Sequence, residues 1–166
     1  MTLNQRLQEI AKDLYGVSAT DDDILFLRSR LPPALRPDWL ISMLRDYKLA
    51  GVSLSLAMEH DRSRLGADLI WLTPQQIVSE AQDAEPGISV MSSGFLAIGA
   101  CATGSGDPYF LDLRGTSNDP PVTRIPHEYA TQNSYPLDRI EVVTPSLSEF
   151  FSNASIGHAL GVRGSN

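Results

Sequence analysis

The sequence has one cysteine in 166 residues, Cys101, so an intramolecular disulfide is excluded. A lone cysteine also agrees with a reducing compartment. No run of about 18 apolar residues is present that would span a membrane. The opening residues, MTLNQRLQEIAKDL, are polar and amphipathic, and they lack the basic, apolar and small-residue segments of a signal peptide. These absences predict a cytoplasmic protein with no membrane partner.

Lysine is absent after Lys48, and no stretch of the sequence is strongly basic. Residues 1–50 carry 7 basic and 7 acidic side chains, whereas residues 51–166 carry 6 and 13, so the later part holds the entire net charge of −7. A phosphate backbone selects clustered lysine and arginine, so nucleic acid is a poor partner. A basic protein partner suits this distribution better, although a modest negative charge also simply keeps a domain soluble.

Signatures of catalysis and cofactor binding are missing as well. The glycine-rich loop 104–106 leads through Asp107 and Pro108 into a strand, whereas a phosphate-binding loop needs a lysine and a hydroxyl that lead into a helix. The histidines are His60, His127 and His158, and none accompanies a GxSxG motif or a zinc-ligand spacing. We therefore expect no enzymatic activity, no cofactor and no metal.

Helix signals fall in the first third, in the middle and near the end of the chain. Capping patterns begin at Thr2, Thr20, Thr73 and Ser146, and Pro37 fits the first position of a further helix. Apolar residues recur at helical spacing after each of these starts. The pattern predicts helices near residues 3–14, 20–31, 37–47, 74–84 and 146–151.

Period-two alternation and short apolar runs predict six strands between these helices. Prolines on both sides of 122–125 favour an edge position for that strand. Strands grouped in hairpins predict an α+β fold with a mainly antiparallel sheet and helices packed against it. We expect one domain over residues 1–152 and a flexible tail over 153–166. The predicted strands lie near 52–58, 67–72, 95–103, 109–114, 122–125 and 139–143.

The stretch 94–115 is predicted to be a hairpin at the centre of the fold. Its first strand, from Phe95 to Thr103, is apolar or small throughout, as in a strand buried on both faces. In the second strand Tyr109, Leu111 and Leu113 alternate with Phe110, Asp112 and Arg114. One face is therefore apolar, and the other is open to water or to a partner.

Three stretches have the order and spacing of a known family. Residues 98–113 read IGACATGSGDPYFLDL, residues 122–128 contain a valine strand followed by the pair His127 and Glu128, and residues 146–151 read SLSEFF. These stretches resemble the SUKH superfamily, also called the Smi/Knr-like family, and LRPDWLISML at 35–44 is similar to its Leu-Pro-x-x-Tyr helix. The positions that match in the first stretch are Ile98, Gly99, Gly106, Asp107, Tyr109 and Asp112.

The resemblance implies an α+β fold without enzymatic activity. Many bacterial members are immunity proteins that bind and neutralise a cognate toxin, and fungal members are regulatory scaffolds. We therefore expect an immunity protein that binds a cognate toxin, for which a basic nuclease is one candidate, with an intracellular regulatory adaptor as the alternative. Asp107 and Asp112 have a second interpretation, in which they only stabilise the hairpin. The candidate partner-binding residues are Asp107, Tyr109, Phe110, Asp112 and Arg114.

Overall fold

The structure is a computed structural model that describes residues 1–103, 106–131 and 134–157. Within these residues the chain forms a seven-stranded sheet and six α-helices, the α+β fold with an antiparallel sheet that the sequence predicts. The helices are α1 (Leu3–Ile10), α2 (Asp21–Arg30), α3 (Asp38–Asp46), α4 (Pro74–Gln82), α5 (Gly87–Met91) and α6 (Leu147–Asn153). The strands are β1 (Ser53–Leu56), β2 (Ala67–Trp71), β3 (Phe95–Cys101), β4 (Tyr109–Asp112), β5 (Val122–Arg124), β6 (Glu141–Thr144) and β7 (Ser155–Gly157).

The sheet has the strand order β6-β5-β4-β3-β2-β1-β7, and each neighbouring pair is antiparallel. β3 is the middle strand, and its residues Phe95 to Gly99 are buried, which confirms the prediction of a central strand. A β-bulge between Ala97 and Gly99 shifts its register against β4. Because a bulge bends its strand and increases the local twist, this irregularity helps the sheet to curl.

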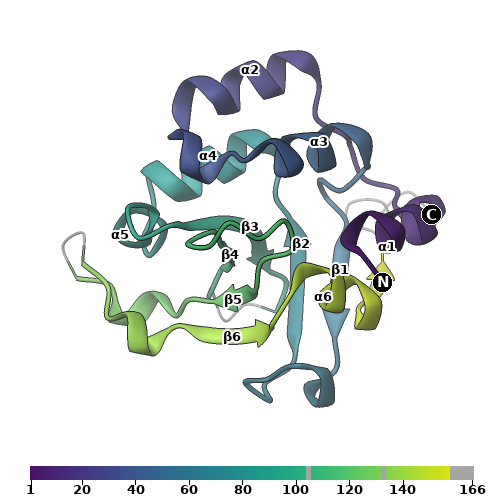
Figure 1. Cartoon of the computed structure of the whole chain (residues 1–166). Helices are drawn as coiled ribbons and strands as arrows, with labels where there is room; N and C mark the ends of the chain where they lie inside the picture. The colour runs from purple at the N-terminus through teal and green to yellow at the C-terminus, as the bar shows by residue number, and fades with distance from the viewer. Residues whose placement is uncertain (104–105, 132–133, 158–166) are drawn as a thin grey trace, which may run out of the picture.

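Helices cover the sheet in two groups, as Figure 1 shows. α4 and α5 pack on β3, α2 packs on α4, and α3 lies beside α2. The other group is α1 with α6, where the ring of Phe151 stacks on the ring of Trp71 from β2 at a centroid distance of 5.9 Å. The buried apolar side chains of both groups and of the sheet form one contiguous core.

The predicted capping patterns set the starts of four helices. Thr2, Thr20 and Thr73 each accept a hydrogen bond from the backbone amide three residues later, and that later side chain bonds back to the amide of the cap. Ser146 accepts from the amide of Glu149 in the same way at α6. These bonds satisfy amides that the first helical turn leaves without partners, so the predictions of these starts are confirmed.

The structure corrects three predictions about local elements. β5 is not an edge strand, because it lies between β4 and β6, and all three of its residues are buried. α5 is a helix where the sequence predicted only a break after α4. The tail expected from residue 153 onward instead begins with the last residue of α6 and with β7, which pairs with β1. Residues 158–166 lie outside the described part of the chain.

Candidate functional site

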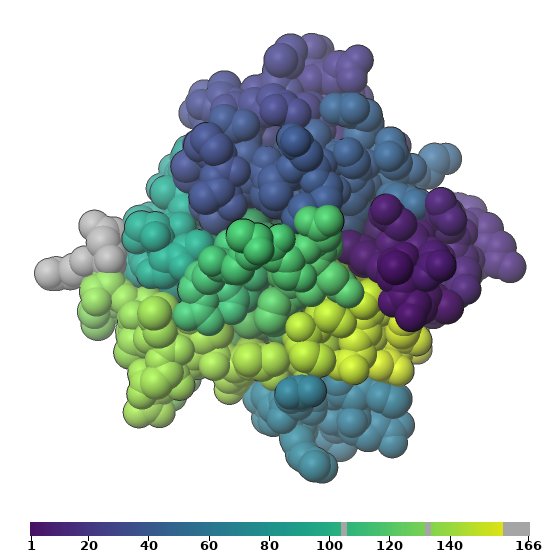
Figure 2. Space-filling model, viewed as in Figure 1, coloured from purple at the N-terminus to yellow at the C-terminus, as the bar shows by residue number. Residues whose placement is uncertain are grey.

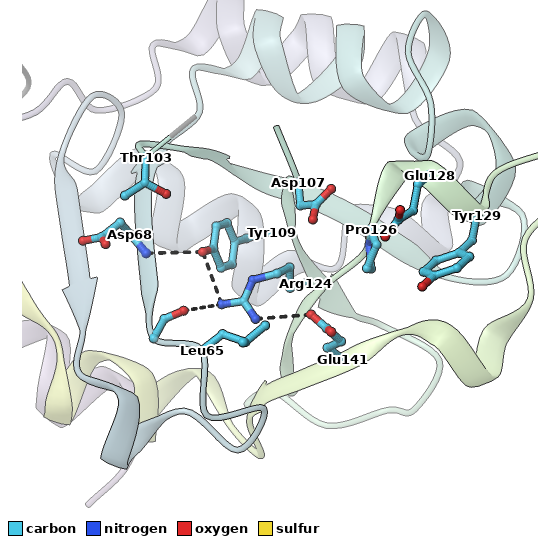
Figure 3. Close-up of a pocket in the computed structure, with 11 residues that line it drawn as sticks. Leu65, Asp68, Thr103, Asp107, Tyr109, Arg124, Pro126, Glu128, Tyr129 and Glu141 are labelled. Carbon is cyan, nitrogen blue, oxygen red and sulfur yellow. Dashed lines mark hydrogen bonds and ion pairs between the residues drawn. The ribbon is translucent and has the colours of Figure 1, made fainter. Parts of the chain in front are cut away.

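A cavity of about 450 Å³ opens at one end of the sheet, where β2, β4, β5 and β6 each contribute a polar side chain. Figure 3 shows these side chains around the opening, together with residues of the turn His127–Tyr129. Its size is within the range of ligand pockets, roughly 300–1,000 Å³. Four carboxylates line it, and they belong to Asp68, Asp107, Glu128 and Glu141.

Arg124 lies at the floor of this cavity, at the end of β5, and is buried. Its Nη1 atom donates to the hydroxyl of Ser63 at 2.8 Å and to Oε1 of Glu141 at 3.3 Å. Its Nη2 atom donates to Oδ2 of Asp61 at 3.1 Å and to the carbonyl oxygen of Gly66. One guanidinium therefore joins β5 to β6 and to the connection between β1 and β2.

Tyr109 completes the contacts of this guanidinium. Its ring lies under the Arg124 guanidinium at 5.2 Å, and its hydroxyl accepts from Nη2 of Arg124 at 3.4 Å and from the backbone amide of Asp68 at 3.2 Å. Burial opposes the charge of Arg124, but the hydrogen bonds of Tyr109 and Asp61 outweigh it and raise the pKa of the guanidinium above its ordinary value. Arg124 therefore stays charged, and both of its terminal nitrogens are used within the chain.

The carboxylates around the opening differ in how they are held. Asp68 accepts from the hydroxyl of Ser55, and Asp107 accepts from the backbone amide of His127 at 3.1 Å and contacts its Nδ1 at 2.7 Å. Glu128 is exposed at the rim. The cavity lining holds four carboxylates and one guanidinium, and that guanidinium is hydrogen-bonded within the chain. The lining therefore has an excess of negative charge.

This negative charge acts on a neighbouring phenol. The hydroxyl of Tyr135 donates to the carbonyl oxygen of Pro126, which lines the cavity, at 2.6 Å. Burial raises the pKa of Tyr135 to about 12, and nearby Asp107 and Glu141 add to this effect by disfavouring a second negative charge. The cavity carboxylates are thus close enough to affect the ionisation of a side chain beside them.

Replacing Tyr135 by phenylalanine is expected to change how stability depends on alkaline pH. The pKa of tyrosine is about 10 in an unfolded chain and about 12 in this fold, so the folded state binds more protons between these values. The stabilisation is fully present below pH 10 and is lost as the pH rises through 12. In urea unfolding at pH 8 to 12, the stability advantage of the natural protein over Tyr135→Phe should shrink across that window.

A suitable control for this experiment is Tyr15→Phe, because the side chain of Tyr15 is 68% exposed. Both variants are compared with the natural protein over the same pH range. Parallel stability curves for the natural protein and Tyr135→Phe would contradict the expectation.

The five candidate partner-binding residues do not form one surface. Asp107 and Tyr109 line the cavity, whereas Asp112 and Arg114 border a second hollow near the far end of β4. Phe110 has no exposed surface, so it cannot contact a partner in this fold, and the prediction that its face is open is wrong there. Both faces of β4 are covered where the sheet curls. Alternation along the strand therefore did not distinguish a solvent-exposed face from a buried one.

Asp107 and Asp112 both make bonds within the chain, as the hairpin-stabilising interpretation expects. Asp112 accepts from the backbone amide of Arg114 at 3.1 Å and pairs with its guanidinium at 2.8 Å. Partial burial alone would raise the pKa of Asp112, but the hydrogen bonds from Arg114 outweigh it and lower the pKa below its ordinary value. Asp107 differs in that its bonds reach His127, 20 positions along the chain, at the mouth of the cavity.

Sequence reasoning missed several residues of this site, namely Asp68, Arg124 and Glu141, which line the cavity, and Asp61, which holds Arg124. One signal was present for Arg124, since it is a charged residue inside the apolar run 122–125. A buried charge requires a partner, but the sequence does not indicate that the partner is Asp61. The glycine loop considered for phosphate binding includes Gly104 and Ser105, which lie outside the described residues.

Among residues 1–103, 106–131 and 134–157, no group of three or more His, Cys, Asp or Glu side chains is arranged to hold a metal ion. No helix in these ranges is long and apolar enough to cross a membrane. Comparisons of the chain with models of protein families, with curated proteins and with solved structures returned no match. The fold and the cavity define an α+β protein with an acidic recess at one end of its sheet.

Proposed function

We propose that this chain is a cytoplasmic, non-catalytic immunity protein of the SUKH type, which binds a cognate toxin and neutralises it. The cavity carries the proposal, because it combines an excess of carboxylates with a buried arginine whose terminal nitrogens already have partners within the chain. Such a site favours a positively charged partner. The resemblance of residues 98–113, 122–128 and 146–151 to the family supplies the toxin as the class of partner.

Electrostatics supports a basic partner in two ways. Complementary charge speeds the encounter of two proteins and penalises wrong partners, and both effects weaken as salt is added. The backbone around the cavity is also fixed before a partner binds, because the guanidinium of Arg124 holds the connection between β1 and β2 against β5 and β6. A site that is rigid before binding loses less conformational entropy when the partner arrives.

Co-expression with the product of the adjacent gene tests this proposal. The neighbour alone should stop growth, the present chain should restore it, and the two proteins should co-purify as a complex whose affinity falls with ionic strength. If the product of the adjacent gene is harmless and does not bind, the proposed immunity function is contradicted. A harmless neighbour that does bind would instead favour the regulatory adaptor.

A matched pair of charge reversals locates the contact. Glu128→Lys changes the exposed rim of the cavity, and Asp138→Lys makes the same change at an exposed position of the turn Leu137–Arg139, outside the cavity lining. Glu128→Lys is expected to weaken the complex by about tenfold or more, because reversing a contact charge adds repulsion to a lost attraction. Equal effects of the two variants would place the contact elsewhere.

A further inference from the structure

The lining of the cavity combines carboxylates with apolar surface, and this combination narrows the kind of ligand it fits. Leu65 lines the opening with 64% of its surface exposed, and Pro126 and the ring of Tyr129 line it as well. Figure 3 labels Leu65 on the lower side of the opening, and Pro126 and Tyr129 on another side. A ligand that matches both parts of the lining has an apolar stem and a charged head.

Arginine and lysine side chains have this composition, since they bury methylene stems along apolar surface while their charged heads stay with polar groups. An inorganic cation would leave the apolar part of the lining without a contact. An anion is opposed by the carboxylates, and both terminal nitrogens of Arg124 already have partners within the chain. The cavity thus selects an organic cation.

The carboxylates reach the cavity from different elements, which favours a guanidinium over an ammonium. Asp68 comes from β2, Glu128 from the turn after β5, and Glu141 from β6. A guanidinium offers five N–H donors spread over a plane, whereas an ammonium is a compact point charge with three. A planar fork can satisfy acceptors on two neighbouring walls at once, such as those of Glu128 and Glu141.

Leu65 is held at this opening by a rigid connection. The segment 57–66 projects from the body of the molecule at the lower edge of Figure 2. It is fastened by Asp61 to Arg124 at 3.1 Å and by the amide of Arg62 to the carbonyl oxygen of Val143 in β6 at 2.9 Å. A large apolar side chain that is exposed and also held in place is a suitable anchor for a partner.

We propose that the cavity binds one arginine side chain presented by the protein partner, with its stem against Leu65 and its guanidinium between Glu128 and Glu141. This inference rests on the proposed function only for the identity of the partner. Burial is the main cause that raises the pKa of the neighbouring Tyr135, and Glu141 and Glu128 add to it.

Binding of a single capped arginine tests the cavity without the partner. N-acetyl-arginine methylamide is titrated into the ¹⁵N-labelled natural protein, and the amide shifts are followed by NMR. We expect saturable shifts at residues that line the cavity, with a dissociation constant in the millimolar range. The lysine analogue should bind several-fold more weakly, and the citrulline analogue, which has the same shape without the charge, should not bind.

Two variants and a control assign the two parts of the lining. Glu128→Gln keeps an acceptor at the rim of the cavity but removes the charge, and is expected to weaken arginine binding by about threefold, as the loss of an exposed ion pair entails. Leu65→Ala should weaken it by about threefold through the lost stem contact. Leu137→Ala, at an exposed leucine outside the cavity lining, should leave it unchanged.

The proposal is overturned by an absence of shifts, by shifts confined to other surfaces, or by citrulline or lysine binding as strongly as arginine. Its failure is separable from that of the immunity function. If the protein binds arginine but the product of the adjacent gene is harmless and does not bind, only the immunity function is refuted. If the protein restores growth in the co-expression experiment but does not bind the arginine analogue, only the proposal of an arginine pocket is refuted.

Discussion

Replacing Arg124 by methionine is expected to lower the free energy of unfolding by about 3–5 kcal/mol, the cost of removing one partner from a buried ion pair. The carboxylate of Asp61 has no solvent exposure, so it would stay buried without its cation. Ser63, Gly66 and Glu141 would lose hydrogen bonds at the same time. Urea unfolding followed by circular dichroism measures the difference.

Arg114→Met is the matched control for this substitution. Arg114 also pairs with an aspartate, Asp112, and stacks on an aromatic ring, that of Phe95, but its side chain is half exposed. An exposed ion pair and cation–π contact together contribute about 1 kcal/mol. Similar losses for the two variants would contradict the view that burial of the Arg124 pair sets its importance.

A double-mutant cycle separates the ion pair from the other contacts of Arg124. Asp61→Asn removes the buried charge and keeps an oxygen that can accept from the amide of Ser63, which Asp61 now does at 2.8 Å. Once the side chain at position 61 is neutral, losing the guanidinium of Arg124 lowers the free energy of unfolding by a smaller amount. The double variant should therefore lose about 1–3 kcal/mol less than the sum of the single variants. Simple additivity would show that the two side chains do not depend on each other.

The same contacts show why the fold could be predicted from sequence further than the site. Helix starts depend on residues three positions apart, such as Thr2 with Gln5, and strands depend on a period of two. Both signals are local. The bond between Arg124 and Asp61 joins residues 63 positions apart, and no pattern in either segment identifies the other.

The elements that sequence reasoning missed or misplaced are short. β7 has three residues, and its pairing with β1 is a long-range contact without a local signal. β5 looked like an edge strand because prolines flank it, but those prolines lie outside its three residues and remove no donor from the strand itself. Short elements are defined by their neighbours more than by their own composition.

The hairpin of β3 and β4 contributes to the site chiefly through one end. Tyr109 starts β4 and supports Arg124, and Asp107 fastens the approach to β4 to His127. The far end carries the Asp112–Arg114 pair and faces a different hollow. Of the residues that the sequence placed in one candidate surface, Asp107 and Tyr109 are therefore the ones that bear on the proposed contact.

Gly87→Ala is expected to destabilise the fold by about 3 kcal/mol, at the upper end of what overpacking costs. Gly87 begins α5 and lies against the end of α4, so close that an added Cβ would overlap the carbonyl oxygen and carbon of Glu80. Those atoms belong to the helix backbone, and they cannot move aside as the end of a flexible side chain would. Relief therefore requires α4 and α5 to separate, although α4 also packs on α2 and β3.

Gly115→Ala supplies the control, because a Cβ there would have no atom within 4 Å and the backbone has no positive φ. That substitution is expected to be neutral or to stabilise by up to about 1 kcal/mol through a less flexible unfolded chain. Urea unfolding of both variants, with the slope of each transition, distinguishes lost packing from a changed unfolded state. If Gly87→Ala unfolds at the same urea concentration as Gly115→Ala, the close approach of α5 to α4 does not govern how this helical layer packs on the sheet.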